Sequence, residues 1–145
     1  MKIYVFGNEL VGEDNLPLQL LPQLKKRLPT VKFIIADPNE DFPPEGERDL
    51  VIFDTVKGVR GPTILNLNDF EAKGKTPASP HDYDLLLHLL LLKKVKKIDR
   101  VIIIGIPPVK DSFKMEQYQK EVYKLMTTLL SKSGSRKTYK GQMPE

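Results

Sequence analysis

The α/β pattern of this chain is set by its first seventeen residues, MKIYVFGNELVGEDNLP at positions 1–17. Residues 2–6 are apolar, β-branched or aromatic, which is typical of a buried strand, and Gly7 and Asn8 end it. Leucines then recur at helical spacing. They lie at positions 16, 18, 20, 21, 24 and 28. The pattern predicts a strand, a loop and a helix that begins near Asn15 and stops before Pro29.

The loop between that strand and helix carries three acids, Glu9, Glu13 and Asp14. In an open α/β sheet, ligands bind at the carboxyl ends of the strands, so this loop is a candidate site. The alternative interpretation is a solvated turn, in which the helix macrodipole favours acids near the helix N-terminus. This stretch alone does not decide between the two.

Length and composition limit the possible classes of protein. The 145 residues suit a single α/β domain, for which we expect the range 1–131. The chain has no cysteine, which excludes disulfides, thiolate catalysis and cysteine-ligated metals. The leucine-rich run at 85–92 is too short to span a membrane, and the N-terminus lacks the pattern of a signal peptide. We therefore expect a cytoplasmic protein without a membrane span.

The net charge of +4 is concentrated at the C-terminal end of the chain. Residues 131–145 hold four basic side chains and one acid, so the rest of the chain is nearly neutral. The segment 132–145 is polar and poor in apolar residues, which predicts a disordered basic tail. No basic patch with interleaved aromatics is evident, so nucleic-acid binding is not expected.

Four further strands and two further helices follow from the patterning. The predicted strands are Val31–Ala36, Leu50–Phe53, Thr63–Leu67 and Arg100–Ile104. Ser79 and Pro80 predict a helix start before a leucine-rich helix that closes at Lys97, and an apolar stripe predicts a last helix up to residue 131. Because few residues separate the third and fourth strands, we expect them to form a hairpin. The predicted fold is a three-layer α/β/α sandwich around a mixed, mostly parallel five-stranded sheet.

Four side chains fall where such a fold would gather them. Asp14, Asp37 and Asp54 follow three predicted strands, and His81 lies in the first turn of the leucine-rich helix. Carboxylates and an imidazole converging from separate segments are suitable ligands for a divalent transition metal. Each residue also has a structural interpretation, because a strand-end Asp often caps a turn and a helix-start His is usually a surface residue. His88, inside the leucine run, is interpreted as a core or edge histidine.

These motifs together resemble the hydrogenase maturation endopeptidases, which trim the C-terminal extension from the large subunit of nickel-iron hydrogenases. The opening IYVFGNELVGED resembles the first strand, Gly-Asn and acidic pair of that family, and Leu50–Asp54 resembles its apolar strand ending in Asp. Ser79-Pro80-His81 resembles its histidine motif. Gly105-Ile106-Pro107-Pro108 resembles its late Gly-x-x-Pro turn. The resemblance extends from the first strand to the last helix.

The resemblance implies a function and a set of site residues. It implies an α/β/α sandwich in which Asp14, Asp54 and His81 gather around a metal, with Glu13 and Asp37 as alternative or auxiliary ligands. The nickel would arrive bound to the large-subunit precursor, which is the expected partner, and the same ligands would also accept other divalent metals. No nucleophilic side chain is implied. We expect a monomer or weak oligomer.

Three departures from the family pattern leave a second function open. The order Glu13-Asp14 in the acidic pair leaves Glu13 as an alternative ligand. Pro17 stands where the opening motif usually continues to a glycine, and Pro38 follows Asp37 where a glycine-rich turn is usual. A divergent branch acting on another hydrogenase class and a loss of activity would both explain them. The alternative function is a non-catalytic α/β binding protein, either a nickel-site chaperone or a small-ligand binder.

Overall fold

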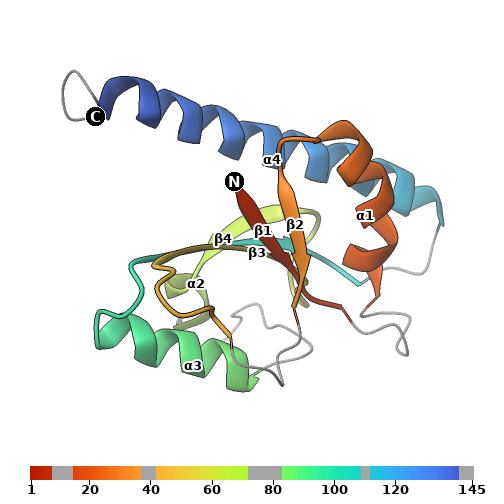
Figure 1. Ribbon diagram of the computed structural model, residues 1–145. Coiled ribbons are helices and arrows are strands. Elements are labelled where there is room, and N and C mark those ends of the chain that lie inside the picture. The colour runs from red at the N-terminus through yellow and green to blue at the C-terminus, as the bar shows by residue number, and fades with distance from the viewer. Residues whose placement is uncertain (8–14, 37–41, 72–82, 109–111, 141–145) are drawn as a thin grey trace.

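The computed structural model describes residues 1–7, 15–36, 42–71, 83–108 and 112–140 of the chain (Figure 1). In chain order the elements are β1 (Lys2–Val5), α1 (Leu16–Arg27), β2 (Lys32–Ile35), β3 (Asp49–Thr55), β4 (Thr63–Asn66), α2 (Asn68–Glu71), α3 (Tyr83–Lys94), β5 (Arg100–Ile106) and α4 (Ser112–Lys140).

The described strands form one five-stranded sheet in the order β2-β1-β3-β5-β4. β1 pairs in parallel with β2 and β3, and β3 pairs in parallel with β5 over seven residues. Only β4, at one edge, runs antiparallel to its neighbour. The predicted mixed, mostly parallel five-stranded sheet is confirmed.

The predicted hairpin between the third and fourth strands is wrong. β4 pairs with β5, and β5 lies between β3 and β4. Burial of the strands explains why β5, and not β4, lies beside β3. β3 and β5 are the two longest strands and are apolar along most of their length, so both take central positions. β4 has an alternating half-exposed pattern that suits an edge.

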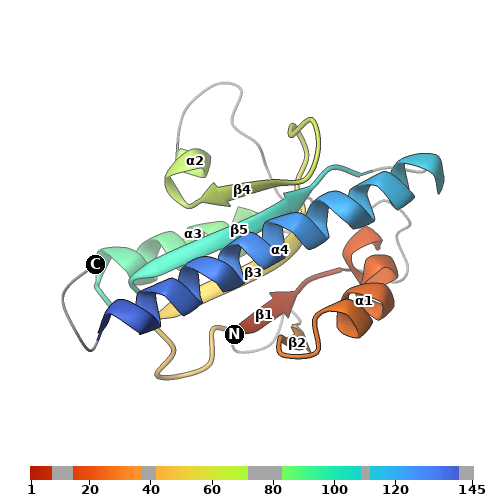
Figure 2. The same cartoon turned by 90° about the horizontal axis from the view of Figure 1, so that it is seen from above.

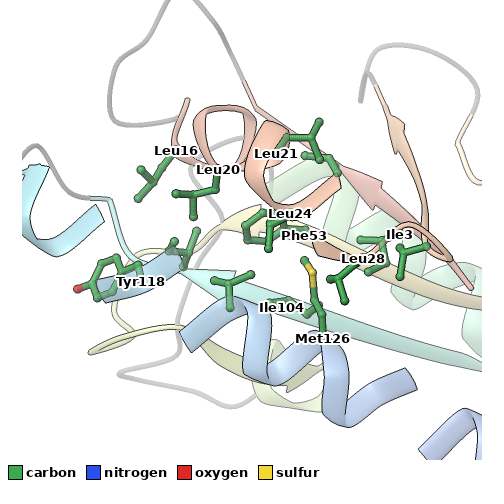
Figure 3. Close-up of a cluster of buried hydrophobic side chains, with 14 of the residues drawn as sticks. Ile3, Leu16, Leu20, Leu21, Leu24, Leu28, Phe53, Ile104, Tyr118 and Met126 are labelled. Atoms are coloured by element: carbon green, nitrogen blue, oxygen red, sulfur yellow. The ribbon is translucent and has the colours of Figure 1, made fainter. Parts of the chain in front are cut away.

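Helices cover both faces of the sheet, as the sandwich prediction requires. α1 and α4 lie on one face and α3 lies on the other (Figures 1 and 2). Figure 3 shows leucines of α1 packing toward Phe53 of β3 and Met126 of α4. The opposite face has its own core, built around Leu50, Ile52 and Leu89.

The helices differ from the prediction in three places. The leucine-rich helix α3 ends at Lys94 rather than at Lys97. Residues 68–71 form the short helix α2, which is not among the helices predicted from the sequence. α4 continues through Lys140, beyond the predicted end of the last helix at residue 131. Extending an existing helix costs far less free energy than nucleating one, because each added residue gains a hydrogen bond. The boundary at residue 131 stays a prediction. Within the described ranges, no helix has both the length and the apolar character needed to cross a membrane.

Candidate functional site

The carboxyl ends of β1, β3 and β5 lie at one edge of the sheet because these strands are parallel. In the sheet, β2 lies on one side of β1. The strands that follow β3 in the chain, β4 and β5, lie on the opposite side of the sheet, beyond β3. The order of the strands therefore reverses between β1 and β3. In open α/β sheets, the crevice at such a reversal is where ligands bind.

Asp54 occupies the end of β3 at this reversal. Its residue is only 3% exposed, and strand alternation places its side chain on the α3 face with Leu50 and Ile52. Its Oδ1 accepts a hydrogen bond from the Thr55 backbone N–H, at 2.8 Å. A buried carboxylate held in a defined orientation at a strand end is the geometry that the sequence predicts for a ligand or a proton acceptor.

Thr55 is a buried polar residue that the sequence analysis did not single out. It is fully buried and lies on the opposite face of the sheet from Asp54. Its hydroxyl has no hydrogen-bond partner among the residues that the structure describes. A buried hydroxyl without a partner costs free energy of folding, and such groups in native proteins call for an explanation. The Asp54–Thr55 dipeptide thus places polar groups on both faces of the sheet at the candidate edge.

Gly105 lies beside Asp54, since the two residues are register partners in β3 and β5. The sequence places Gly105 in a turn after the strand, but β5 continues through Ile106. A Cβ at this position would come within 2.9 Å of Val56 Cγ2 and 3.3 Å of Leu65 Cδ1. Glycine is therefore needed here for packing, next to the candidate carboxylate.

A group of aromatic rings supports the end of β1 at the same edge. The Phe42 ring meets those of Tyr4 and Phe6 edge-on, with centroids 5.1 and 5.2 Å apart. The Phe42 carbonyl oxygen lies 3.1 Å from Nε2 of His88 on α3. His88 is exposed, so of the two interpretations the edge histidine applies. Its contact joins α3 to the segment that leads into β3.

Asp54 is the only predicted site residue whose position the structure describes. Asp14, His81, Glu13 and Asp37 lie outside the described residues. The described ranges contain no cluster of three or more His, Asp or Glu side chains suited to a metal. The metal set of Asp14, Asp54 and His81 therefore stays a prediction.

Comparison of the sequence finds no matching family model and no matching curated protein. Two solved structures are similar in fold. The NiFe hydrogenase maturation protease HybD from Thermococcus kodakarensis is 16% identical, with a TM-score of 0.61 over 89% of this chain and 99% of that one. A hydrogenase 3 maturation protease is 19% identical, with a TM-score of 0.51 over 86% of this chain and 87% of that one. The chain therefore has the fold of the hydrogenase maturation proteases, the family that its strand-end motifs resemble.

Proposed function

We propose that this protein is an endopeptidase that removes the C-terminal extension of a nickel-loaded NiFe hydrogenase large-subunit precursor. The observation that carries the proposal is the position of Asp54, a 3% exposed carboxylate at the end of β3. It lies at the reversal of strand order, where this fold class binds ligands. The similarity in fold to two hydrogenase maturation proteases supports the same reaction class.

In the proposed reaction, nickel is part of the substrate. Asp54, Asp14 and His81 would contact the precursor-borne metal and so fix the scissile peptide relative to the enzyme. The donor set suits this role, because two carboxylates and one imidazole leave coordination positions for the ligands of the precursor. Glu13 or Asp37 would replace or assist one of the carboxylates.

Peptide hydrolysis then needs a water molecule and a proton acceptor. A metal next to the scissile bond polarises the carbonyl or activates the water. A neighbouring carboxylate takes the proton that the water loses, and the departing amine gains one. The new C-terminal carboxylate and the released extension are the products. No nucleophilic side chain is needed.

Replacement of His81 and Asp54 tests the proposal. The protein would be incubated with a nickel-loaded precursor encoded beside it, and cleavage followed by mass spectrometry. His81→Ala and Asp54→Asn should each slow cleavage by about 100-fold or more, because each removes a contact to the metal. Asp54→Asn keeps an oxygen that can accept the Thr55 N–H bond, so the end of β3 should stay intact.

His88→Ala is the matched control. It removes the other histidine of the chain, whose described contact is the Phe42 carbonyl oxygen, and it should leave cleavage unchanged. Normal cleavage by a folded His81→Ala protein would overturn the proposed site. If the wild type binds the precursor but cleaves none of the co-encoded candidates, the non-catalytic binding function is correct instead.

A further inference from the structure

The ladder between β1 and β3 is interrupted at the amino edge of the sheet, opposite Asp54. The two strands pair only at Tyr4 with Ile52 and at Val5 with Phe53. The same register would pair Lys2 with Leu50, yet no bridge forms there. In Figure 1 the two strands diverge toward their amino ends. The sheet is therefore open between two of its inner strands.

A cavity of about 470 Å³ lies at this opening. Its walls come from both faces of the sheet, with Leu50 from the α3 side and Val51, Ile102 and Leu129 from the α4 side. These four side chains are apolar, and the volume falls within the range of small-molecule sites. The cavity can thus accept an apolar group between the strands.

Charged side chains surround the mouth of this cavity. The basic lining residues are Lys2, Arg100 and Lys132, and the acidic ones are Glu47 and Asp49. The Glu47 carboxylate already interacts with two neighbouring side chains. It accepts a hydrogen bond from the Tyr4 hydroxyl and pairs with Lys2, whose Nζ lies 3.5 Å from its Oε1.

The remaining charge at the mouth is positive. Arg100 and Lys132 are both exposed, and no ion pair is found for either in the part of the chain that the structure describes. Asp49, the register partner of Arg100, also acts on the neighbouring guanidinium of Arg48. Among the lining residues, two cations, Arg100 of β5 and Lys132 of α4, therefore stand against one remaining acid, Asp49, and this excess of positive charge favours an anionic group at the mouth.

We propose that this cavity binds an amphipathic anion, with an apolar body between β1 and β3 and a carboxylate, sulfonate or phosphate group at Arg100 and Lys132. The site is separate from the candidate active site. Asp49 and Asp54 lie at opposite ends of β3, which five residues of strand rise separate by about 17 Å. The proposal does not depend on the proposed protease activity.

Titration with 1-anilinonaphthalene-8-sulfonate tests this site, because the probe joins an aromatic body to a sulfonate. The wild-type protein should enhance its fluorescence saturably with one site per chain, and decanoate should displace it. Arg100→Gln and Lys132→Gln should each weaken binding by about fivefold, since each removes one solvent-exposed charge contact. Lys120→Gln, which changes an exposed lysine of the same helix away from the cavity, should have no effect.

Val51→Phe tests the apolar part of the site, because the larger ring would fill the cavity. It should abolish saturable binding while the melting curve stays cooperative. Leu91→Gln alters an exposed leucine of α3, 54% exposed and far from the cavity lining, and should leave binding unchanged. Equal weakening by Lys120→Gln or Leu91→Gln would overturn the proposal. Wild-type affinity in both Arg100→Gln and Lys132→Gln would also overturn the proposal. These two variants provide the test if Val51→Phe does not fold.

Discussion

Tyr4 is a buried phenol in β1, with 3% of its surface exposed and its hydroxyl donating to the Glu47 carboxylate. Burial raises the pKa of Tyr4 far above its usual value of 10.0, and the hydrogen bond and negative charge of Glu47 raise it further. Each of these effects disfavours the phenolate. The folded protein therefore holds this proton at pH values where the unfolded chain releases it.

The stability of the fold should accordingly fall as pH rises above about 10, where an unfolded tyrosine loses its proton. The contribution is fully present below that pH and is lost progressively as the pH approaches the raised pKa of the folded state. Melting temperatures measured between about pH 8 and pH 11 should fall less steeply for Tyr4→Phe than for the wild type. Tyr118→Phe removes a phenol from the other core and should keep the wild-type slope. Parallel slopes for Tyr4→Phe and the wild type would contradict the prediction.

Asp54 and Thr55 are neighbours at the end of β3, and their side chains lie on opposite faces of the sheet. Strand alternation places the carboxylate on the α3 face and the hydroxyl on the α1 and α4 face. The same dipeptide supplies the Thr55 N–H that holds Asp54 Oδ1 at 2.8 Å. The orientation of the candidate carboxylate is therefore local in origin, whereas its burial depends on the surrounding strands.

At the scale of elements, the contact between β5 and the end of β3 depends on Gly105. The nearest atoms to an added Cβ would be the Val56 Cγ2 at 2.9 Å and the Val56 Cβ at 3.2 Å. Both distances are shorter than ordinary packing allows. The segment that follows Asp54 would have to move to accept any side chain on β5.

Gly105→Ala should lower the free energy of unfolding by about 1–3 kcal/mol, the usual cost of overpacking a core. Urea denaturation measures the change. Gly61→Ala is the control, because nothing lies within 4 Å of the Cβ it would add, and its effect should stay within about 0.5 kcal/mol. Adding Val56→Ala to Gly105→Ala should recover part of the loss, since the clash is with Val56. Strict additivity of the two changes would show that the cost has another origin.

At the scale of the whole molecule, the folded unit depends on α4 only as far as its buried residues extend. Among the side chains of this helix that the structure describes, at residues 114–132, the buried ones are Tyr118, Val122, Met126 and Leu129. Residues 133–145 are mostly polar and basic. A segment of this composition has little apolar surface to bury, so we expect it to add little to the stability of the folded unit.

Removal of residues 133–145 should therefore leave the melting temperature within about 4 °C of the full chain, which corresponds to about 1 kcal/mol or less for a domain of this size. Calorimetry on both proteins measures the difference. A larger decrease would mean that the last turns of α4 dock on the domain, and the boundary at residue 131 would be wrong. The truncated protein keeps Lys132 and so also keeps the proposed anion site.

The sequence by itself determined the fold class and most of the elements, though not α2, because strands and helices follow from local apolar periods of 2 and 3.6 residues. It also placed Asp54 at the end of a buried strand. Local patterns do not report which strands become neighbours. The insertion of β5 between β3 and β4 follows from pairing between residues about fifty positions apart, and the sequence predicted a hairpin instead.

Only the tertiary structure decided the surroundings of the candidate carboxylate. Gly105 beside Asp54, the unpaired hydroxyl of Thr55 and the opening between β1 and β3 each depend on contacts between distant segments. Such contacts form when the most apolar strands take the central positions of one sheet. Which strands do so depends on the total apolar surface that the whole fold removes from water, rather than on the order of residues within any single element.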